Sequence, residues 1–345
     1  MKKPPLKKEL PSLKPKVTSV APEALVNMAP LSENNLLPLV VTPMLKNLDL
    51  AGWAASNRDM IQANVLKHGA VLFRGFGIDS VAAFERFALS ICSELFKENA
   101  EHTPVNNNGN VQTPVFYSPA KKLLWHNENS FNHEWPLKIM FCCVQPAQQG
   151  GETPLVDSRK VFEQINPAIR QRFLDKQVMY MRNYSEGLGL TWQTVFRTHD
   201  RAEVEAYCRA RGIDFEWKDG DQLRTRQIRP AAIAHPQTGE MSWFNQAQHW
   251  HVSCLDEEIR SSLTALYREE DLPRNCYYGD GSPIEDAAMA HILEVYQELE
   301  VSFPWQQGDV IVVDNVFAAH GRNAFVGPRK LLVSLAEMSS YAALS

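Results

Sequence analysis

Two histidines and one glutamate occupy positions from which they could bind a metal ion. His126 and Glu128 lie two residues apart in LLWHNENSF, and His320 ends the apolar run VVDNVFAAH. If the first segment is a strand, the two side chains leave the same face of it, because side chains alternate along a strand. Two imidazoles and one carboxylate can occupy one face of an octahedral ion and leave three positions open, as in non-haem Fe(II) oxygenases. The sequence therefore predicts a metal site with the ligands His126, Glu128 and His320.

The same residues have simpler explanations, which the surrounding sequence makes less attractive. A His-x-Glu pair also occurs by chance, and many buried histidines only form hydrogen bonds. However, the apolar residues Leu123, Leu124 and Trp125 precede the first pair, and an apolar strand leads to His320. A polar cluster at the end of a buried strand costs free energy unless it is paired or binds a metal. A zinc hydrolase could use the same His2Glu set, because catalytic zinc also takes such ligands.

Helical and strand-like patterns alternate along the chain and must position these ligands. We expect a helix that Ser56 caps and Gly69 ends. The remaining expected helices are 81–97, 159–174, 201–211 and 255–269, and the expected strands are 70–76, 138–146, 240–246, 309–320 and 329–338. Helices followed by β segments with long insertions predict an α+β enzyme built on a β-sandwich or barrel.

Composition narrows the class of protein. The chain has 345 residues, a formal charge of -5 and 44% hydrophobic residues, as expected of a globular enzyme. No basic run follows the first residues, which argues against binding to nucleic acid or to an anionic membrane surface. No apolar stretch is long enough for a transmembrane helix. Six scattered cysteines without a CxxC motif predict reduced thiols and a cytoplasmic protein.

The start of the chain differs in character from the remainder. MKKPPLKKELPSLKPK has the charge of a signal peptide but has prolines and lysines where an apolar segment would follow. We expect residues 1–30 to form a flexible tail. Residues 31–345 are expected to form a single domain.

Four stretches of the chain resemble the TauD/TfdA-type Fe(II)/2-oxoglutarate-dependent dioxygenases, especially the branch of clavaminate synthase and the SyrP-like hydroxylases. They are HGAVLFRGF (68–76), WHNENSFNHEWPLKIMFCCVQPAQQGGETPLVDSRKVF (125–162), WFNQ (243–246) and DNVFAAHGRNAFVGPRKLLV (314–333). HNE, GGETP and HGR–GPR in this order are specific, although none of them is specific alone. The resemblance implies a double-stranded β-helix (jelly-roll) core with helical insertions, of the clavaminate synthase type.

The resemblance also implies roles for individual residues. His126, Glu128 and His320 match the iron ligands, and Thr153 in GGETP matches the threonine that helps to hold 2-oxoglutarate. Arg329 in GPRK matches the arginine that pairs with the distal carboxylate, a role that suits a planar guanidinium. Arg322 is a second candidate for that pairing, or a residue that supports the ligands. Thr153 could instead be a simple turn residue, and Arg329 an exposed charge at the start of a strand.

Other polar residues fit more than one role. Asn245 in WFNQ is expected to contact the substrate or to support the site, whereas Trp243 and Phe244 beside it are expected in the core. Arg197 in GLGLTWQTVFRT fits a substrate contact and a solvated surface position equally well. His249 and His251 repeat the i, i+2 spacing, but the resembling family has no iron ligand there, so we expect a structural or substrate-proximal role.

The resemblance implies an enzyme that binds Fe(II) and takes 2-oxoglutarate and O2 as cosubstrates. It would release succinate and CO2 while hydroxylating an unactivated C–H bond. The expected substrate is a small molecule, an amino acid or its carrier-tethered acyl form in peptide natural product metabolism. The loop 182–197, with Arg182, Glu186 and Arg197, could bind such a substrate. A sulfonate or betaine substrate, a zinc hydrolase and a non-catalytic jelly-roll binding protein are the alternatives.

Overall fold

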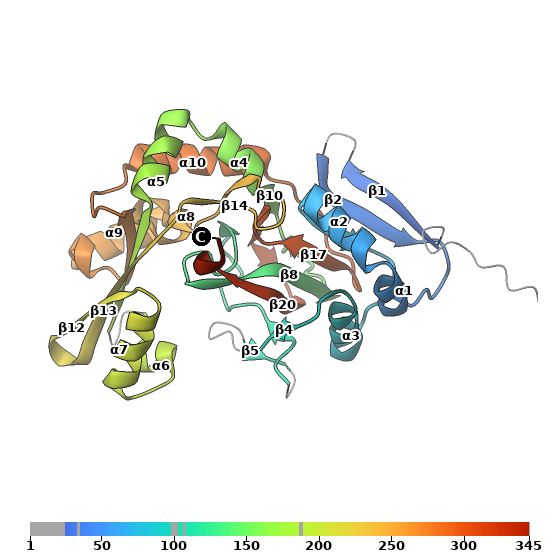
Figure 1. The fold of residues 1–345 in the computed structure, drawn as a ribbon, viewed down its shortest axis with the longest axis horizontal. Helices are drawn as coiled ribbons and strands as arrows, with labels where there is room; N and C mark the ends of the chain where they lie inside the picture. Colours follow the sequence, from blue (N-terminus) through green and yellow to red (C-terminus); the bar gives the residue numbers. More distant parts are fainter. Residues whose placement is uncertain (1–24, 33–34, 98–102, 106–107, 186–188, 345) are drawn as a thin grey trace, which may run out of the picture.

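Strands from both ends of the chain form the large sheet at the centre of the computed structural model (Figure 1). The structure describes residues 25–32, 35–97, 103–105, 108–185 and 189–344. The strands are β1 (Val26–Ser32), β2 (Asn35–Pro43), β3 (Ala70–Phe73), β4 (Leu95–Phe96), β5 (Thr103–Pro104), β6 (Gln112–Thr113), β7 (Leu123–His126), β8 (Glu134–Gln145), β9 (Gln149–Gly150), β10 (Leu155–Asp157), β11 (Val178–Tyr184), β12 (Asp214–Lys218), β13 (Gln222–Arg229), β14 (Ala232–Ala234), β15 (Met241–Trp243), β16 (Arg274–Tyr278), β17 (Val310–Asp314), β18 (Ala318–Arg322), β19 (Phe325–Val326) and β20 (Lys330–Ser340). The helices are α1 (Leu50–Ser56), α2 (Arg58–His68), α3 (Val81–Ile91), α4 (Ser158–Gln164), α5 (Pro167–Lys176), α6 (Trp192–Phe196), α7 (Arg201–Ala210), α8 (Ala247–Trp250), α9 (Glu257–Leu266) and α10 (Asp286–Leu299).

The large sheet has the order β1-β2-β3-β17-β8-β20-β6-β5, and β4 also pairs with β20. Its central strands β8 and β20 are antiparallel and pair from Lys330↔Gln145 to Ser340↔Glu134. A smaller sheet has the order β10-β18-β7. Apolar residues of both sheets, among them Leu155 and Ala318 of the smaller one, form a shared core. Two sheets that enclose a core in this way form the expected jelly roll, which is confirmed.

The alternating side chains of β17 show how the layers are built. Val310 and Val312 pack with helices α1, α2 and α3 on one face of the large sheet. Ile311 and Val313 pack on the other face, toward the smaller sheet. Because both faces are covered, the strand is apolar throughout instead of alternating with polar residues. This arrangement leads the chain directly to β18, which carries His320.

A long insertion separates β10 from β17 and contains helices α4 to α10 and a four-stranded sheet of order β12-β13-β11-β16. It forms the other side of the molecule from β1 and β2 in Figure 1. A cluster around Trp125, Trp243 and Tyr296 joins the insertion to β7. The insertion therefore brings a second layer of side chains against the strand that carries His126. None of the described helices is long and apolar enough to cross a membrane.

Several expected elements differ at their ends. The helix α1 was not expected from the sequence, and Ser56 is its last residue. The Ser56 hydroxyl donates to the Gly52 carbonyl at 3.3 Å, so it does not cap the next helix. Asn57 therefore occupies the cap position of α2, while Gly69, at φ 76°, ends that helix as expected. The helix expected over 81–97 ends at Ile91. The helix expected over 159–174 is divided into α4 and α5, because Pro167 starts a new helix after its cap Asn166.

Two further expectations concern strands and the tail. The run 309–320 is divided into β17 and β18 by a turn at residues 315–317, which matters for the site described below. The expected tail lies outside the described residues up to residue 24. Residues 26–30, which were assigned to that tail, belong to β1 and pair with β2.

Candidate metal centre

Strands β7 and β18 bring the three predicted metal ligands together. His320 pairs with His126 in antiparallel register. Glu128 follows the end of β7, so the expectation that both residues lie on one strand is wrong by two positions. The Nε2 atoms of His126 and His320 each lie 3.8 Å from Oε2 of Glu128, and the potential ligand atoms all lie within 4.8 Å of one another. This arrangement could hold one metal ion on three adjacent positions.

Backbone contacts fix which nitrogen of His126 faces the centre. Nδ1 of His126 lies 3.0 Å from the Leu124 carbonyl, so it donates its hydrogen there and Nε2 is left as the ligand atom. Burial lowers the pKa of His126, although the Leu124 hydrogen bond opposes this effect. The imidazole is therefore neutral at neutral pH, as metal binding requires.

Asn315, in the turn between β17 and β18, holds the backbone of Glu128. Its Oδ1 accepts the Glu128 N–H at 2.6 Å, and its Nδ2 donates to the carbonyls of Glu128 at 2.9 Å and Pro136 at 2.8 Å. Asn127 donates in return to the Asn315 carbonyl at 2.7 Å. Asn127, Glu128 and Asn315 are all buried, and in such surroundings these bonds replace lost water contacts. The position of Glu128 is therefore set by a residue far away in the sequence.

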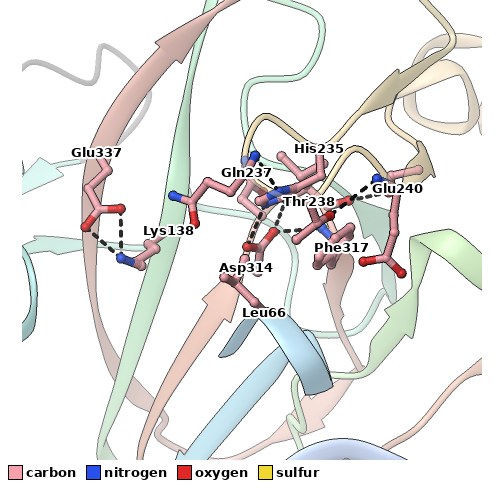
Figure 2. A network of polar contacts seen from close by, with 12 residues as sticks. Leu66, Lys138, His235, Gln237, Thr238, Glu240, Asp314, Phe317 and Glu337 are labelled. Atoms are coloured by element: carbon pink, nitrogen blue, oxygen red, sulfur yellow. Dashed lines mark hydrogen bonds and ion pairs between the residues drawn. The ribbon is translucent and has the colours of Figure 1, made fainter. Parts of the chain in front are cut away.

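A buried acid–histidine pair stabilises the turn that carries Asn315 (Figure 2). Oδ1 of Asp314 accepts the backbone N–H groups of Val316 and Phe317, both at 2.9 Å. Oδ2 of Asp314 lies 3.1 Å from Nε2 of His235, whose ring stacks on Phe317. Figure 2 also shows the separate ion pair between Lys138 on β8 and Glu337 on β20. The turn is thus fixed by contacts other than those of Asn315 with Glu128.

Three side chains of the segment before and within α8 hold β7 in place. Gln246 donates to the Asn127 carbonyl at 2.8 Å, Gln248 to the Trp125 carbonyl at 2.6 Å, and Nε2 of His249 lies 2.8 Å from the Leu124 carbonyl. The His249 ring is 4.7 Å from that of His126. Since its Nε2 is engaged with Leu124, His249 acts as a support and is not part of the ligand cluster. His251 instead bonds to Ser253 and to the Ile284 carbonyl, as a structural residue.

A cavity of about 360 Å³ is lined by the three candidate ligands and by Thr153. Thr153 is buried, and its Oγ1 accepts the indole N–H of Trp305 at 3.1 Å. Because an indole can only donate, the hydroxyl hydrogen of Thr153 remains for an acceptor in the cavity. This suits a carboxylate of a bound ligand.

Arg329 lines the same cavity and has donors to spare. Its Nε donates to the Gly151 carbonyl at 2.8 Å. A Cβ at Gly151 would lie 3.0 Å from Cδ and Nε of Arg329, so this glycine leaves room for the arginine. Among the described residues, no hydrogen bond engages the two terminal nitrogens of Arg329. Burial, and then the nearby Arg322, lower its pKa to about 10, so it is still a cation at neutral pH.

Arg322 also lines the cavity but uses its terminal nitrogens differently. Its guanidinium donates to three backbone carbonyls, those of Tyr117 at 3.0 Å, Ser118 at 2.5 Å and Lys121 at 2.7 Å. Among the described residues, both terminal nitrogens of Arg322 are engaged and only its Nε lacks a partner, whereas both terminal nitrogens of Arg329 are left for an anion.

The structure does not bring Asn245 and Arg197 to the cavity. Asn245 is fully buried, donates to the Ala231 carbonyl at 2.7 Å and accepts the Ala247 N–H at 3.0 Å, so its amide is used by the backbone. Arg197 is exposed at the end of α6 and is absent from the cavity lining. Arg182 packs over Tyr184 instead, and Glu186 lies outside the described residues. Trp243 and Phe244 are buried in the core as expected.

The residues that the sequence analysis missed lie behind the candidate ligands or, in the case of Trp305, behind Thr153. They are Asn315, Asp314, His235, Gln246, Gln248 and Trp305. The Asp-Asn pair that interrupts the apolar run 309–320 was a usable signal, because buried polar side chains need specific partners. Gln246 stands in the resembling stretch WFNQ but had no role assigned, and no local pattern indicated Gln248; their partners are backbone carbonyls more than a hundred residues away.

The sequence matches one family model and two proteins of known sequence over most of its length. A family model described as "Taurine catabolism dioxygenase TauD, TfdA family" matches residues 32–335. The dapdiamide synthesis protein DdaC from Enterobacter agglomerans is 38% identical over 269 residues, 77% of this chain and 82% of that protein. A clavaminate synthase-like protein from Arabidopsis thaliana is 29% identical over 282 residues, 77% of this chain and 81% of that protein.

Solved structures agree at the level of the fold. PvcB from Pseudomonas aeruginosa has a TM-score of 0.55 at 14% identity and covers 92% of both chains. A taurine dioxygenase from Burkholderia xenovorans has a TM-score of 0.53 at 16% identity, covering 90% of this chain and 89% of that one. At such low identity the likeness shows a shared architecture.

Proposed function

The chain belongs to the TauD/TfdA family of Fe(II)/2-oxoglutarate-dependent dioxygenases, and on this premise we propose that it hydroxylates an unactivated C–H bond of an amino acid or of an aminoacyl group on a carrier protein. One observation carries the proposal. The imidazoles of His126 and His320 and the carboxylate of Glu128 converge at a cavity that also contains Thr153 and the free guanidinium donors of Arg329.

Each of these residues has a role in the proposal. His126, Glu128 and His320 hold Fe(II), which together with 2-oxoglutarate and O2 supplies the oxidising chemistry and yields succinate and CO2. The Thr153 hydroxyl donates to one carboxylate of 2-oxoglutarate. Arg329 pairs with the other carboxylate, because a planar guanidinium grips a carboxylate with two charge-assisted bonds. Gly151 suits the position beside it, because its φ of 75° favours glycine and a Cβ there would crowd Cδ and Nε of the arginine.

The composition of the cavity bears on the substrate. Arg322, Arg329 and Lys330 line it, whereas Glu128 is its sole acidic residue among those described. Once Glu128 binds the metal, no carboxylate of this lining is left to pair with an ammonium group. We therefore infer that the amino group of the substrate faces the open mouth, where water solvates it, and that a free amino acid places its carboxylate toward the cations. The carbonyl end of a carrier-bound aminoacyl group would instead face the mouth, because the carrier protein stays outside the cavity.

The relatives support a place in specialised metabolism. DdaC, at 38% identity, is named for dapdiamide synthesis. A sulfonate remains a second candidate substrate, because the excess of cations in the cavity would also suit an anion of that kind. A betaine is less suited, since its permanent cation would meet Arg322 and Lys330. The hydrolase and binding-protein alternatives are set aside, because the family is one of oxygenases.

Anaerobic titration of the Fe(II) protein with 2-oxoglutarate tests the cofactor assignment. A visible absorption band from the metal–cosubstrate chelate should appear in the wild-type protein and be lost in His320→Ala. Screening then addresses the substrate: free amino acids, carrier-bound aminoacyl groups, sulfonates and betaines are compared for substrate-dependent succinate release. Stimulation by sulfonates alone would leave the cofactor assignment intact and reject the amino acid proposal.

A further inference from the structure

The segment 113–121 forms the outer wall of the cavity, although it has almost no regular secondary structure. Its contributions to the cavity lining are Thr113, Pro114, Val115, Phe116, Tyr117 and Pro119. β6 ends at Thr113, and the chain then continues as loop and turn until β7. Phe116 is 88% exposed. An apolar wall that is open to solvent at the mouth of a cavity needs a specific attachment to keep its position.

Arg322 and Phe325 provide this attachment. The three carbonyls that accept hydrogen bonds from the Arg322 guanidinium, those of Tyr117, Ser118 and Lys121, all belong to this segment. The Phe325 N–H adds a bond to the Pro119 carbonyl at 2.9 Å. The guanidinium also packs over the rings of Tyr117 and Phe325, at 5.5 and 5.0 Å from their centroids. A charged donor shared by three carbonyls is stronger than neutral bonds of the same number.

The origin of Arg322 gives this attachment its significance. Arg322 is on β18, two residues after His320, so the wall is tied to the same strand as a proposed metal ligand. We propose that Arg322 is a positioning residue that sets the wall 113–121 relative to the metal centre, and that Phe116 and Tyr117 on this wall select the substrate. The proposal rests on the proposed function, because the wall matters for selection only if oxidation takes place at the inner end of the cavity.

The side chains of the wall define what they select. Pro114, Val115, Phe116 and Tyr117 present carbon atoms and one hydroxyl, while the cations Arg322, Arg329 and Lys330 come from other parts of the lining. A substrate that reaches the metal centre past this wall would therefore lay its aliphatic or planar portion against Phe116 and Tyr117. Covering Phe116 removes its exposed ring from water, which favours substrates with an apolar body.

The first test compares Arg322→Ala with Arg329→Ala in two measurements that do not depend on turnover. Amide hydrogen exchange of peptides within 108–122 should become about tenfold faster or more in Arg322→Ala, because the loss of several charge-assisted bonds frees the segment. Affinity for 2-oxoglutarate, from the anaerobic absorption titration, should change by less than about threefold. Arg329→Ala should instead weaken 2-oxoglutarate binding and leave the hydrogen exchange of these peptides nearly unchanged.

Rescue separates positioning from a general loss of structure. Arg322→Lys keeps a cation but cannot reach all three carbonyls, so its exchange rate should be intermediate. Millimolar guanidinium should slow the exchange of the segment in Arg322→Ala, whereas ethylammonium should not. Unchanged exchange in both variants, or a loss of 2-oxoglutarate affinity in Arg322→Ala equal to that in Arg329→Ala, overturns the positioning role.

Phe116→Ala tests substrate selection, with Leu266→Ala as a control at another highly exposed apolar residue, on α9. In the substrate screen, Phe116→Ala should accept additional or larger compounds, measured as succinate release, while Leu266→Ala should match the wild type. Identical profiles for all three proteins overturn the selection role. If the wild type itself forms no chelate with 2-oxoglutarate, the proposed function fails, and the exchange experiment still decides whether Arg322 fastens the wall.

Discussion

Asn315 holds the main chain of Glu128 through both of its amide atoms, accepting the Glu128 N–H at 2.6 Å and donating to the Glu128 carbonyl at 2.9 Å. The two residues come from different strand ends and meet in a buried position. The side chain of Glu128 is therefore aimed by its backbone, and this backbone is fixed by one asparagine. Removing an interaction of this kind behind a ligand typically lowers metal affinity by about tenfold to a hundredfold.

Asn315→Ala should weaken Fe(II) affinity by about tenfold to a hundredfold, because the Glu128 backbone loses its partners. It should also lower the free energy of unfolding by about 2 kcal/mol or more, since buried donors and acceptors are left unsatisfied. Anaerobic metal titration and denaturant unfolding measure the two effects. Asn275→Ala is the matched control, because Asn275 is equally buried but belongs to β16 of the insertion. Equal metal affinities in the two variants would contradict the role of Asn315.

His126→Ala and His320→Ala should each abolish metal binding while the fold is retained, because the strands keep their own apolar core. In the wild type, Mn(II) at about a hundred times its Kd should stabilise the protein by about 2.7 kcal/mol. Neither variant should show this stabilisation in thermal unfolding. His251→Ala serves as the control, since that histidine bonds to Ser253 and Ile284, away from the ligand cluster. A full metal-induced shift in either ligand variant would reject the ligand set.

Arg329→Ala should reduce 2-oxoglutarate affinity by about a hundredfold or more and leave metal affinity nearly unchanged, because the bound cosubstrate loses its buried cationic partner. Arg329→Lys should fall in between, since an ammonium keeps the charge but not the planar pair of donors. Titration of the Fe(II) protein with 2-oxoglutarate under nitrogen gives the cosubstrate affinity. A separate titration of the metal-free protein gives the metal affinity. Unaltered cosubstrate affinity in Arg329→Ala would move the anion site elsewhere in the cavity.

The cysteines should be unreactive in the native protein at pH 8. Burial raises the pKa of Cys92, Cys142 and Cys143 to about 12, and that of Cys208 to about 11. The thiolate is the reactive form, so these groups stay protonated until the pH approaches those values. Since an unfolded thiol ionises near pH ~8.5, their contribution to stability is complete below that pH and is lost as the pH rises toward about 12. Ellman's reagent, with and without denaturant, measures the difference, and rapid reaction of the native buried thiols would contradict the burial.

The sequence was sufficient for the type of fold and for the three candidate ligands that the structure brings together, but not for the residues behind them. His126, Glu128 and His320 were identifiable because residue types with metal chemistry stood beside apolar strands. Gln246 and Gln248 donate to backbone carbonyls, and the sequence alone does not show which carbonyls a glutamine side chain will reach. Only the three-dimensional pairing of α8 with β7 reveals them.

The choice between Arg322 and Arg329 illustrates the same limit. Both arginines follow His320 within one short stretch, and both line the cavity. What distinguishes them is the number of occupied donors, which depends on where the segment 117–121 passes. Arg197 and Asn245 were plausible by type and position, yet one is on the surface and the other bonds to backbone groups nearby. Residue type indicated the chemistry, while the path of the loops decided the assignment.

The separation of Glu128 and Asn315 by 187 residues has a consequence for biosynthesis. A ribosome synthesises β7 with His126, and Glu128 just after it, well before it makes the turn and strand that complete the centre. Domains generally fold as units as the chain emerges, so β7 must wait for its partner β18. Assembly of the proposed iron site therefore requires that β18 has been made, and nascent or truncated chains that stop before β18 would carry two of the proposed ligands without the third.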